Sequence, residues 1–197
     1  MPKNRIVPDV QSRRKRWSED IAGYKAENLV FLDESGINTD MTRLYGRAPS
    51  NERAVDNTPL NTPTTTTILS SIRMNGEMAY TTYTGGTTAE RFRDYLENVL
   101  LPTLDEHAVI IMDNMKSHHA RIVKAFLDER KIAYLYLPPY SPDLNPIEKL
   151  WSKLKSILRK LKVRAFEKLP LAVAQAFCSI SAEDCRNWFS SCGLCIK

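Results

Sequence analysis

Runs of apolar residues along the chain predict the strands of one β-sheet. Residues 28–32 end in Leu-Val-Phe-Leu, an unbroken apolar run that is typical of a strand buried on both faces. Residues 64–73 and 77–84 are rich in β-branched and aromatic residues, and the Asn-Gly pair between them is a strong hairpin signal. Shorter runs at 108–112 and 133–137 complete a set of five predicted strands.

Helical periodicity marks the segments between and after these strands. Apolar residues recur there every three or four positions, which places them on one face of a helix. The predicted helices span residues 18–25, 87–101, 120–130, 147–161, 169–180 and 182–189, and residues 36–63 are expected to be irregular because Gly, Pro and Asn interrupt them. The residues predicted to face inward are Ile122, Val123, Phe126 and Leu127 in the helix at 120–130, and Ile147, Leu150, Trp151, Leu154, Leu158 and Leu161 in the long helix.

Three carboxylates stand at the ends of these predicted elements. Asp33 directly follows the first apolar run, Asp113 follows the run at 108–112, and Glu148 stands at the start of the long helix. No cysteine or histidine pattern accompanies them, so the set suits hard divalent cations, which prefer oxygen ligands. Such ions catalyse phosphodiester cleavage in pairs.

The residues around the second and third carboxylates carry a family resemblance. Asp113 opens an Asp-Asn pair, and 34 residues separate it from Glu148, which ends the block Pro-Tyr-Ser-Pro-Asp-Leu-Asn-Pro-Ile-Glu. Segments 31–36, 43–49 and 185–189 agree with the same pattern. Together these features resemble the catalytic DDE domain of mariner-superfamily transposases, and within them the bacterial insertion-sequence type.

The resemblance implies an RNase H-like fold, an α/β domain whose mixed five-stranded sheet is flanked by helices. In that fold the first strand lies centrally and pairs with the fourth, so Asp33 and Asp113 would end adjacent parallel strands. Glu148 would face the same edge from the first turn of its helix. Residues 1–27 are then a basic lead-in, and residues 28–197 form the catalytic domain.

The function implied is metal-dependent cleavage and transfer of DNA strands. Asp33 would bridge two Mg²⁺ or Mn²⁺ ions, with Asp113 on one ion and Glu148 on the other. The implied partners are double-stranded DNA, both transposon ends and target, and further copies of the chain in a homodimer or higher oligomer on that DNA.

One departure from the family concerns the N-terminus. Mariner-type transposases carry a helix-turn-helix region there, whereas only 27 residues precede the first predicted strand. We therefore expect a catalytic half, from a split gene, a deliberate shortening or a truncation, with an upstream helix-turn-helix polypeptide as a candidate partner. Two rival functions stay open: a non-catalytic DNA-binding remnant that regulates a full-length transposase, and a nuclease acting on RNA–DNA hybrids or junctions. The Asn-Pro-Ile-Glu block argues against the second.

The carboxylate positions also have plainer interpretations. Glu148 follows Asn145 and Pro146 at the spacing of a capping box, which would serve the helix without any metal. Alternation along a strand sends Asp33 and Glu34 to opposite faces, so only one of them can be a ligand. The family position selects Asp33 and leaves Glu34 behind the ligands or on the surface.

Further polar residues near the predicted site have several possible roles. Asn114 could support the ligands by hydrogen-bonding a metal-bound water or a phosphate, or it could cap a turn. His118 and His119 invite a zinc or general-base interpretation, but we favour contact with DNA or a place at a helix start. Four cysteines, Cys178, Cys185, Cys192 and Cys195, lie in the last 20 residues, and we expect free thiols rather than a zinc site because no histidine is near.

Charge favours nucleic acid as a partner. The formal net charge is +5 and the isoelectric point is about 9.0, with Lys and Arg gathered at residues 13–16 and 149–168. The residues expected to form one exposed, DNA-facing side of the long helix are Lys149, Lys153, Lys160 and Arg164. A solvated helix face is the plainer alternative. No apolar run approaches the roughly 20 residues of a membrane helix, and no signal peptide is apparent. We expect a bacterial, nucleoid-associated cytoplasmic protein without a membrane partner.

Overall fold

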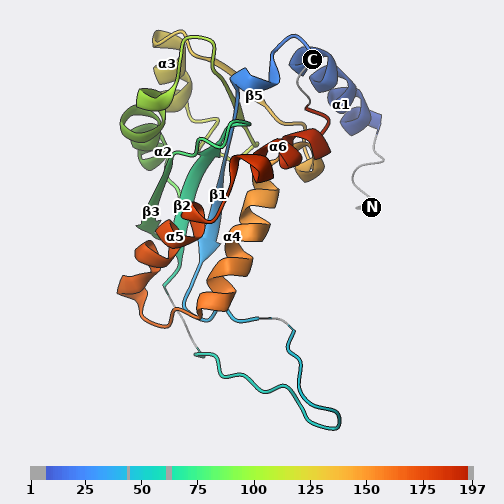
Figure 1. Cartoon of the computed structure of the whole chain (residues 1–197). Coiled ribbons are helices and arrows are strands. Elements are labelled where there is room, and N and C mark those ends of the chain that lie inside the picture. Colours follow the sequence, from blue (N-terminus) through green and yellow to red (C-terminus); the bar gives the residue numbers. More distant parts are fainter. Residues whose placement is uncertain (1–7, 44, 61–63, 195–197) are drawn as a thin grey trace.

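A mixed five-stranded sheet forms the centre of the structure, a computed structural model that describes residues 8–43, 45–60 and 64–194 (Figure 1). Its strand order is β3-β2-β1-β4-β5, in which β1 pairs antiparallel with β2 and parallel with β4. The strands are β1 (Leu29–Ile37), β2 (Thr66–Ile72), β3 (Tyr80–Thr84), β4 (Val109–Met112) and β5 (Ala133–Tyr136). The predicted mixed sheet of five strands is therefore confirmed.

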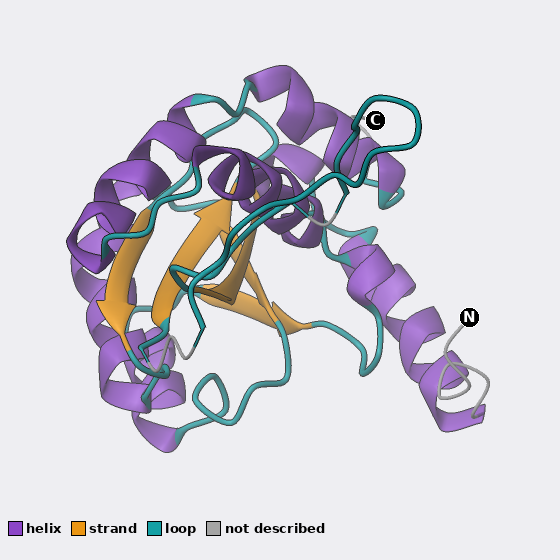
Figure 2. Cartoon of the chain, turned by 90° about the horizontal axis from the view of Figure 1, so that it is seen from below, coloured by secondary structure: helices purple, strands orange, loops and turns teal. Residues whose placement is uncertain are grey.

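Helices cover both faces of this sheet (Figure 2). They are α1 (Pro8–Ile21), α2 (Ala89–Tyr95), α3 (Arg121–Glu129), α4 (Ile147–Leu161), α5 (Leu169–Cys178) and α6 (Ala182–Ser191). Alternate residues of β1 enter two different cores, because successive side chains of a strand point to opposite faces. Val30 and Leu32 pack in the core under α2 and α3, whereas Leu29 and Phe31 pack in the core under α4, α5 and α6.

Strand β1 is longer than the apolar run predicts. It pairs with β4 only as far as Leu32 opposite Met112, but its pairing with β2 continues to Ile37. The polar residues after Leu32 thus remain in the strand, held by β2 alone. Asp33 consequently lies within β1, at the point where the parallel partner ends, rather than in a loop beyond the strand.

Helix α4 packs through its apolar stripe. Leu150, Leu154 and Leu158 are buried against the sheet and α5, and burial of each leucine contributes about 1.5–3 kcal/mol to stability. The prediction was wrong for Leu161 and Ile122, whose side chains are 43% and 42% exposed. Both lie in a terminal turn of their helix, where the body of the protein no longer covers them.

Helix α1 differs most from expectation. It spans Pro8–Ile21 rather than residues 18–25. Its apolar stripe of Val10, Trp17 and Ile21 is buried, and Trp17 and Ile21 belong to the core under α4, α5 and α6. The basic run between these residues hides the stripe in the sequence. Because α1 contributes to that core, it is packed onto the body, and the proposed division after residue 27 stays a prediction.

The tip of the β2–β3 hairpin requires glycine. Gly76 has a φ of +95°, a conformation that side chains other than glycine rarely adopt. A Cβ placed there would come within 2.9 Å of the Cα of Ala182, at the start of α6. The Asn-Gly signal therefore marks both the predicted turn and a close contact between the hairpin and a C-terminal helix.

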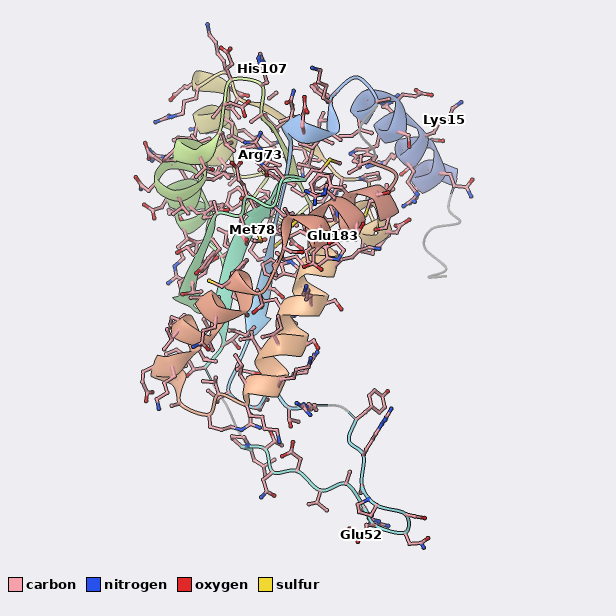
Figure 3. The ribbon with its side chains drawn as sticks, in the orientation of Figure 1. Lys15, Glu52, Arg73, Met78, His107 and Glu183 are labelled. Carbon is pink, nitrogen blue, oxygen red and sulfur yellow. The ribbon has the colours of Figure 1, made fainter. Side chains whose placement is uncertain are left out.

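An extended arm leaves the body after β1. The arm comprises residues 38–43 and 45–60, is irregular as predicted, and carries Glu52 near its tip (Figure 3). Its root is tied to the segment after α4. The guanidinium of Arg164 donates hydrogen bonds to the carbonyls of Thr39 and Met41 (2.7 and 2.8 Å), and Lys162 pairs with Asp56.

None of the helices in the described ranges is long and apolar enough to span a membrane.

Replacement of Arg164 by alanine should loosen the arm. The variant loses the hydrogen bonds to the carbonyls of Thr39 and Met41, so limited trypsin digestion should cut at Arg43, Arg47 or Arg53 several times faster than in the wild type. Lys160→Ala, which removes an exposed charge from α4, is the matched control. Equal cutting rates in the Arg164 variant and the wild type would show that these bonds do not hold the arm.

Candidate active site

The parallel register of β1 and β4 brings two aspartates together. Leu32 lies opposite Met112, and the next residue of each strand segment is Asp33 and Asp113. Both side chains line a cavity of about 450 Å³, and Glu148 joins them from the first turn of α4. The other lining residues are Asn114, Met115, Leu137, Pro138, Pro139, Tyr140, Ser141, Pro142 and Asn145. The structure therefore gathers the three predicted carboxylates in one cavity.

Asp33 is buried and held by two donors. The backbone N–H of Glu34 donates to its Oδ1 (2.8 Å), and the indole N–H of Trp151 donates to its Oδ2 (3.1 Å). Burial, together with the nearby charges of Asp113 and Glu148, raises the pKa of Asp33 to about 7, although the hydrogen bond from the Glu34 N–H lowers it. Trp151 is a core residue as predicted, but its hydrogen bond to Asp33 was not foreseen.

Asp113 has the opposite electrostatic balance. The N–H of Met115 donates to its Oδ1 (2.9 Å), and Nδ1 of His118 lies 2.8 Å from the same oxygen. The ring does not aim that N–H well at the oxygen, so the contact is an ion pair rather than a well-formed hydrogen bond. Burial opposes ionisation here, but His118 and the Met115 N–H outweigh it and lower the pKa of Asp113.

Glu148 is the least restrained of the three. Its side chain is exposed and has no hydrogen-bond or ion-pair partner among the residues that the structure describes. The cavity removes water from part of this side chain, which raises the pKa of Glu148; the charge of Lys155 opposes this and that of Asp113 adds to it. The capping interpretation does not hold, because Oδ1 of Asn145 accepts no hydrogen bond and α4 begins after Pro146.

The three carboxylates share the cavity without closing on one point. In the described part of the chain, no group of three His, Cys, Asp or Glu side chains is arranged as a ready metal site. Like charges repel one another, so the unrestrained Glu148 has no reason to approach the two aspartates unless a cation lies between them.

A family profile described as DDE superfamily endonuclease matches residues 28–170, most of the chain. The chain belongs to this family. A curated relative, the Transposable element Tcb1 transposase of Caenorhabditis briggsae, is 27% identical over 110 residues, which cover 48% of this chain and 40% of the relative. The chain thus spans less than half of that protein.

Solved structures of the Mos1 transposase share the fold. The paired-end complex with left transposon end has a TM-score of 0.77 at 18% identity, covering 97% of this chain and 64% of the Mos1 chain. The catalytic domain of the Mos1 mariner transposase alone has a TM-score of 0.73 at 18% identity and covers 96% and 89%. At this identity the likeness concerns the fold, and it confirms the RNase H-like architecture.

The polar residues next to the carboxylates of this DDE domain make contacts that the sequence did not predict. His118 is fully buried, so the expectation that it faces DNA was wrong; it contacts Glu34 through Nε2 (3.1 Å) and Asp113 through Nδ1. Burial opposes protonation of this ring, but the contacts with Asp113 and Glu34 raise the pKa of His118 to about 9. Asn114 donates to the carbonyl of Leu137 (2.6 Å) and contacts His119, which stacks on Tyr136.

The predicted basic face of α4 is only partly present. Lys149 and Lys160 are exposed, but Lys153 pairs with Asp184 of α6. Arg164 lies beyond the helix, which ends at Leu161, and holds the arm instead, so its assignment to a DNA-facing helix surface was wrong. Part of the N-terminal basic run at residues 13–16 likewise makes contacts within the protein.

Helix α1 uses two of its arginines within the protein. Arg14 donates to Ser141 and, through both terminal nitrogens, to Asp143, while Arg13 pairs with Asp9. Asp143 therefore has a structural role, in a short 3₁₀ turn that precedes Glu148. This contact fastens the loop before α4 to the first helix.

Two basic residues of α4 were not singled out from the sequence. Lys155 and Arg159 follow Glu148 by seven and eleven positions, which places them on its face of the helix. The charges of Glu148 and Asp33 act on Lys155, although its burial and the neighbouring Arg159 lower its pKa. The helical spacing from Glu148 was a signal that could have identified both residues.

The cysteines show no metal site in the described residues. Cys178 is exposed, whereas Cys185 and Cys192 are buried, and all three are free. Burial raises the pKa of the Cys185 thiol to about 11, which keeps it protonated and unreactive. Cys195 lies outside the described residues, so the expectation that it is a free thiol is not tested.

In EDTA, the stability of the protein should fall as the pH rises from about 4 to 7. The folded state binds the Asp33 proton more tightly than the unfolded chain, because the pKa of Asp33 rises from 3.8 to about 7 on folding. The protonated Asp33 contributes about 2–4 kcal/mol to the free energy of unfolding; this contribution is complete below about pH 4 and is lost as the pH rises through about 7. Thermal unfolding across this pH range measures the slope.

Asp33→Asn cannot ionise and should flatten that slope, whereas Asp94→Asn, an exposed carboxylate on α2, should not. His118 acts in the separate window between 6.5 and 9, since its pKa is raised on folding. An unchanged slope in Asp33→Asn would contradict the electrostatic description of the site.

Proposed function

We propose that this chain is the catalytic domain of a mariner-type transposase, which cleaves and joins DNA strands with two divalent metal ions. The observation that carries the proposal is the adjacency of Asp33 and Asp113 on β1 and β4, with Glu148 in the same cavity. This arrangement occurs in a chain of an endonuclease family, which fits phosphodiester chemistry.

The donor set fits Mg²⁺ or Mn²⁺. The three carboxylates offer only oxygen, which hard divalent cations prefer. Burial and the neighbouring acids disfavour the ionised form of Asp33 and raise its pKa, and a bound cation would favour that form again. Related Mos1 structures carry Mn or Mg in their names. Asp33, Asp113 and Glu148 would hold the ions, and a count of two remains part of the proposal.

The chain's own residues then divide the work. When bound, the ions supply Lewis acidity that activates the attacking oxygen and stabilises the leaving oxygen. Asp33 is oriented by the Glu34 N–H and Trp151, and Asp113 by the Met115 N–H and His118. Glu148 is free to turn toward them. No side chain needs to act as a nucleophile, because water or a DNA 3′-hydroxyl can attack directly.

The partners follow from the same proposal. Double-stranded DNA, as transposon ends and target, would lie over the cavity and be held by Lys149, Lys160 and His119, with Lys155 and Arg159 on the same face of α4 as Glu148. A homodimer or higher oligomer on DNA and a helix-turn-helix polypeptide upstream are further proposals. So are the bacterial insertion-sequence branch and a place at the bacterial nucleoid, which rest on the motif block alone. Lys153 would serve only if it left Asp184.

The regulatory alternative, an inactive DNA-binding remnant, has no specific support. The three carboxylates and the donors that orient the two aspartates are all in place, and an inactive protein would not need them. A direct test of activity separates the two proposals.

Loss of any one carboxylate should abolish strand cleavage. Asp33→Ala, Asp113→Ala and Glu148→Ala should each slow Mn²⁺-dependent nicking of supercoiled plasmid by at least about 100-fold, because each removes a metal ligand. DNA binding should persist, which a gel-shift assay measures. Glu106→Ala, an exposed carboxylate near the start of β4, is the control. Full activity in EDTA would refute the metal mechanism.

DNA affinity should depend steeply on salt and little on sequence. Backbone contacts by lysines release counterions, and each contact contributes about 0.9 to the slope of log K against log salt. The double variant Lys149→Gln/Lys160→Gln should lower that slope by about 2 and weaken binding about equally for unrelated duplexes. Lys25→Gln/Lys131→Gln is the matched control. Tight, salt-insensitive binding to one sequence would contradict this assignment.

A further inference from the structure

A buried chain of contacts runs from the interior of the DDE domain to Asp113. Oε1 of Glu34 lies 3.1 Å from Nε2 of His118, and Nδ1 of the same ring lies 2.8 Å from Oδ1 of Asp113. The side chains of Glu34 and His118 are 7% and 0% exposed, whereas that of Asp113 is 39% exposed. The histidine therefore joins a buried carboxylate to one that lines the cavity.

Strand geometry explains why Glu34 can serve here. Because successive side chains alternate, Asp33 points to the cavity and Glu34 points to the opposite face of β1, the side of Leu32 and α2. His118 lies in the loop between β4 and α3 and reaches that face. Glu34 thus approaches Asp113 through the ring and not through the cavity.

The imidazole is fixed from several sides. The ring of His118 packs on Phe92 with centroids 4.2 Å apart. The hydroxyl of Tyr136 donates to the backbone carbonyl of His118 (2.9 Å), and the backbone N–H of His118 donates to the carbonyl of Met115 (3.1 Å). A ring held in this way transmits the position of Glu34 to Asp113 with little freedom.

Asp113 is left with one oxygen for the cavity. Both the Met115 N–H and His118 act on Oδ1, so no contact in the described part of the protein engages Oδ2. The carboxylate is consequently oriented before any ligand arrives. A plain packing role would not require this arrangement, because an apolar pair of similar size would fill the space without burying a charge.

We propose that Glu34 and His118 are positioning residues for Asp113, and that they hold its free oxygen where a divalent cation binds. This inference rests on the proposed function and adds a role for two residues that touch neither the DNA nor the ions. Outer contacts of this kind commonly change metal affinity 10–100-fold when they are removed.

The test measures Mn²⁺ binding by the thermal stabilisation that it produces, and separately the Mn²⁺ concentration for half-maximal nicking. Glu34→Gln keeps the shape of the side chain and removes its charge, and His118→Asn removes the ring. Each should raise the Mn²⁺ concentration needed about 10–100-fold, and the double variant should be no worse than His118→Asn alone, because both act through one chain. His107→Asn, an exposed histidine near the start of β4 (Figure 3), is the matched control.

The outcomes are distinguishable. If the wild type responds to Mn²⁺ but Glu34→Gln responds equally, the positioning role is overturned while the proposed function stands. If both variants lose stability without a change in Mn²⁺ dependence, the contacts serve packing only and the inference fails. Mn²⁺ could also fail to stabilise the wild type, or could stabilise Asp113→Asn as much as the wild type. In either case the proposed function itself fails, and this inference with it. Should His118→Asn not fold, the isosteric Glu34→Gln decides.

Discussion

The parallel pairing of β1 with β4 is the contact on which the rest of the site depends. Its register sets Leu32 opposite Met112 and thereby makes Asp33 and Asp113 neighbours. A slip of one residue would turn Asp33 to the opposite face and present Glu34 to the cavity, since side chains alternate along a strand. Both faces of β1 are buried in separate cores, and this burial makes such a slip costly. Packing far from the cavity therefore decides which carboxylate is displayed.

The three carboxylates are not equivalent, and their differences have physical causes. Asp33 is buried and its pKa is raised, Asp113 has a histidine beside it and its pKa is lowered, and Glu148 is exposed and unrestrained. Two acids are thus fixed and one can move. A cavity of this kind tolerates its own repulsion without a ligand, because the exposed acid can withdraw toward water while the two aspartates stay in place.

The local features of this fold could be predicted from the sequence, and the long-range ones could not. Apolar runs and helical stripes report on burial within one element, so the five strands, α4 and the three carboxylates could be identified from the sequence. The ring of His118 meets Glu34 across 84 positions, and Trp151 meets Asp33 across 118. No periodicity carries such pairings, because they arise only when the sheet has closed. Basic residues misled for a related reason: Arg14 and Arg164 make internal contacts, and charge alone does not distinguish those from contacts with DNA.

The clasp between Arg14 and the loop before α4 has a consequence for the order in which the protein matures. Arg14 and Asp143 are 129 positions apart. During synthesis the first helix leaves the ribosome long before its docking site exists, and domains form as their segments become available. Trp17 and Ile21 therefore remain exposed to solvent until β1, β4 and α4 have been translated and can form the core into which they pack. Helix α1, which is translated before the sheet, is thus among the last parts of this domain to dock, and until then the nascent chain carries an apolar surface that chaperones could recognise.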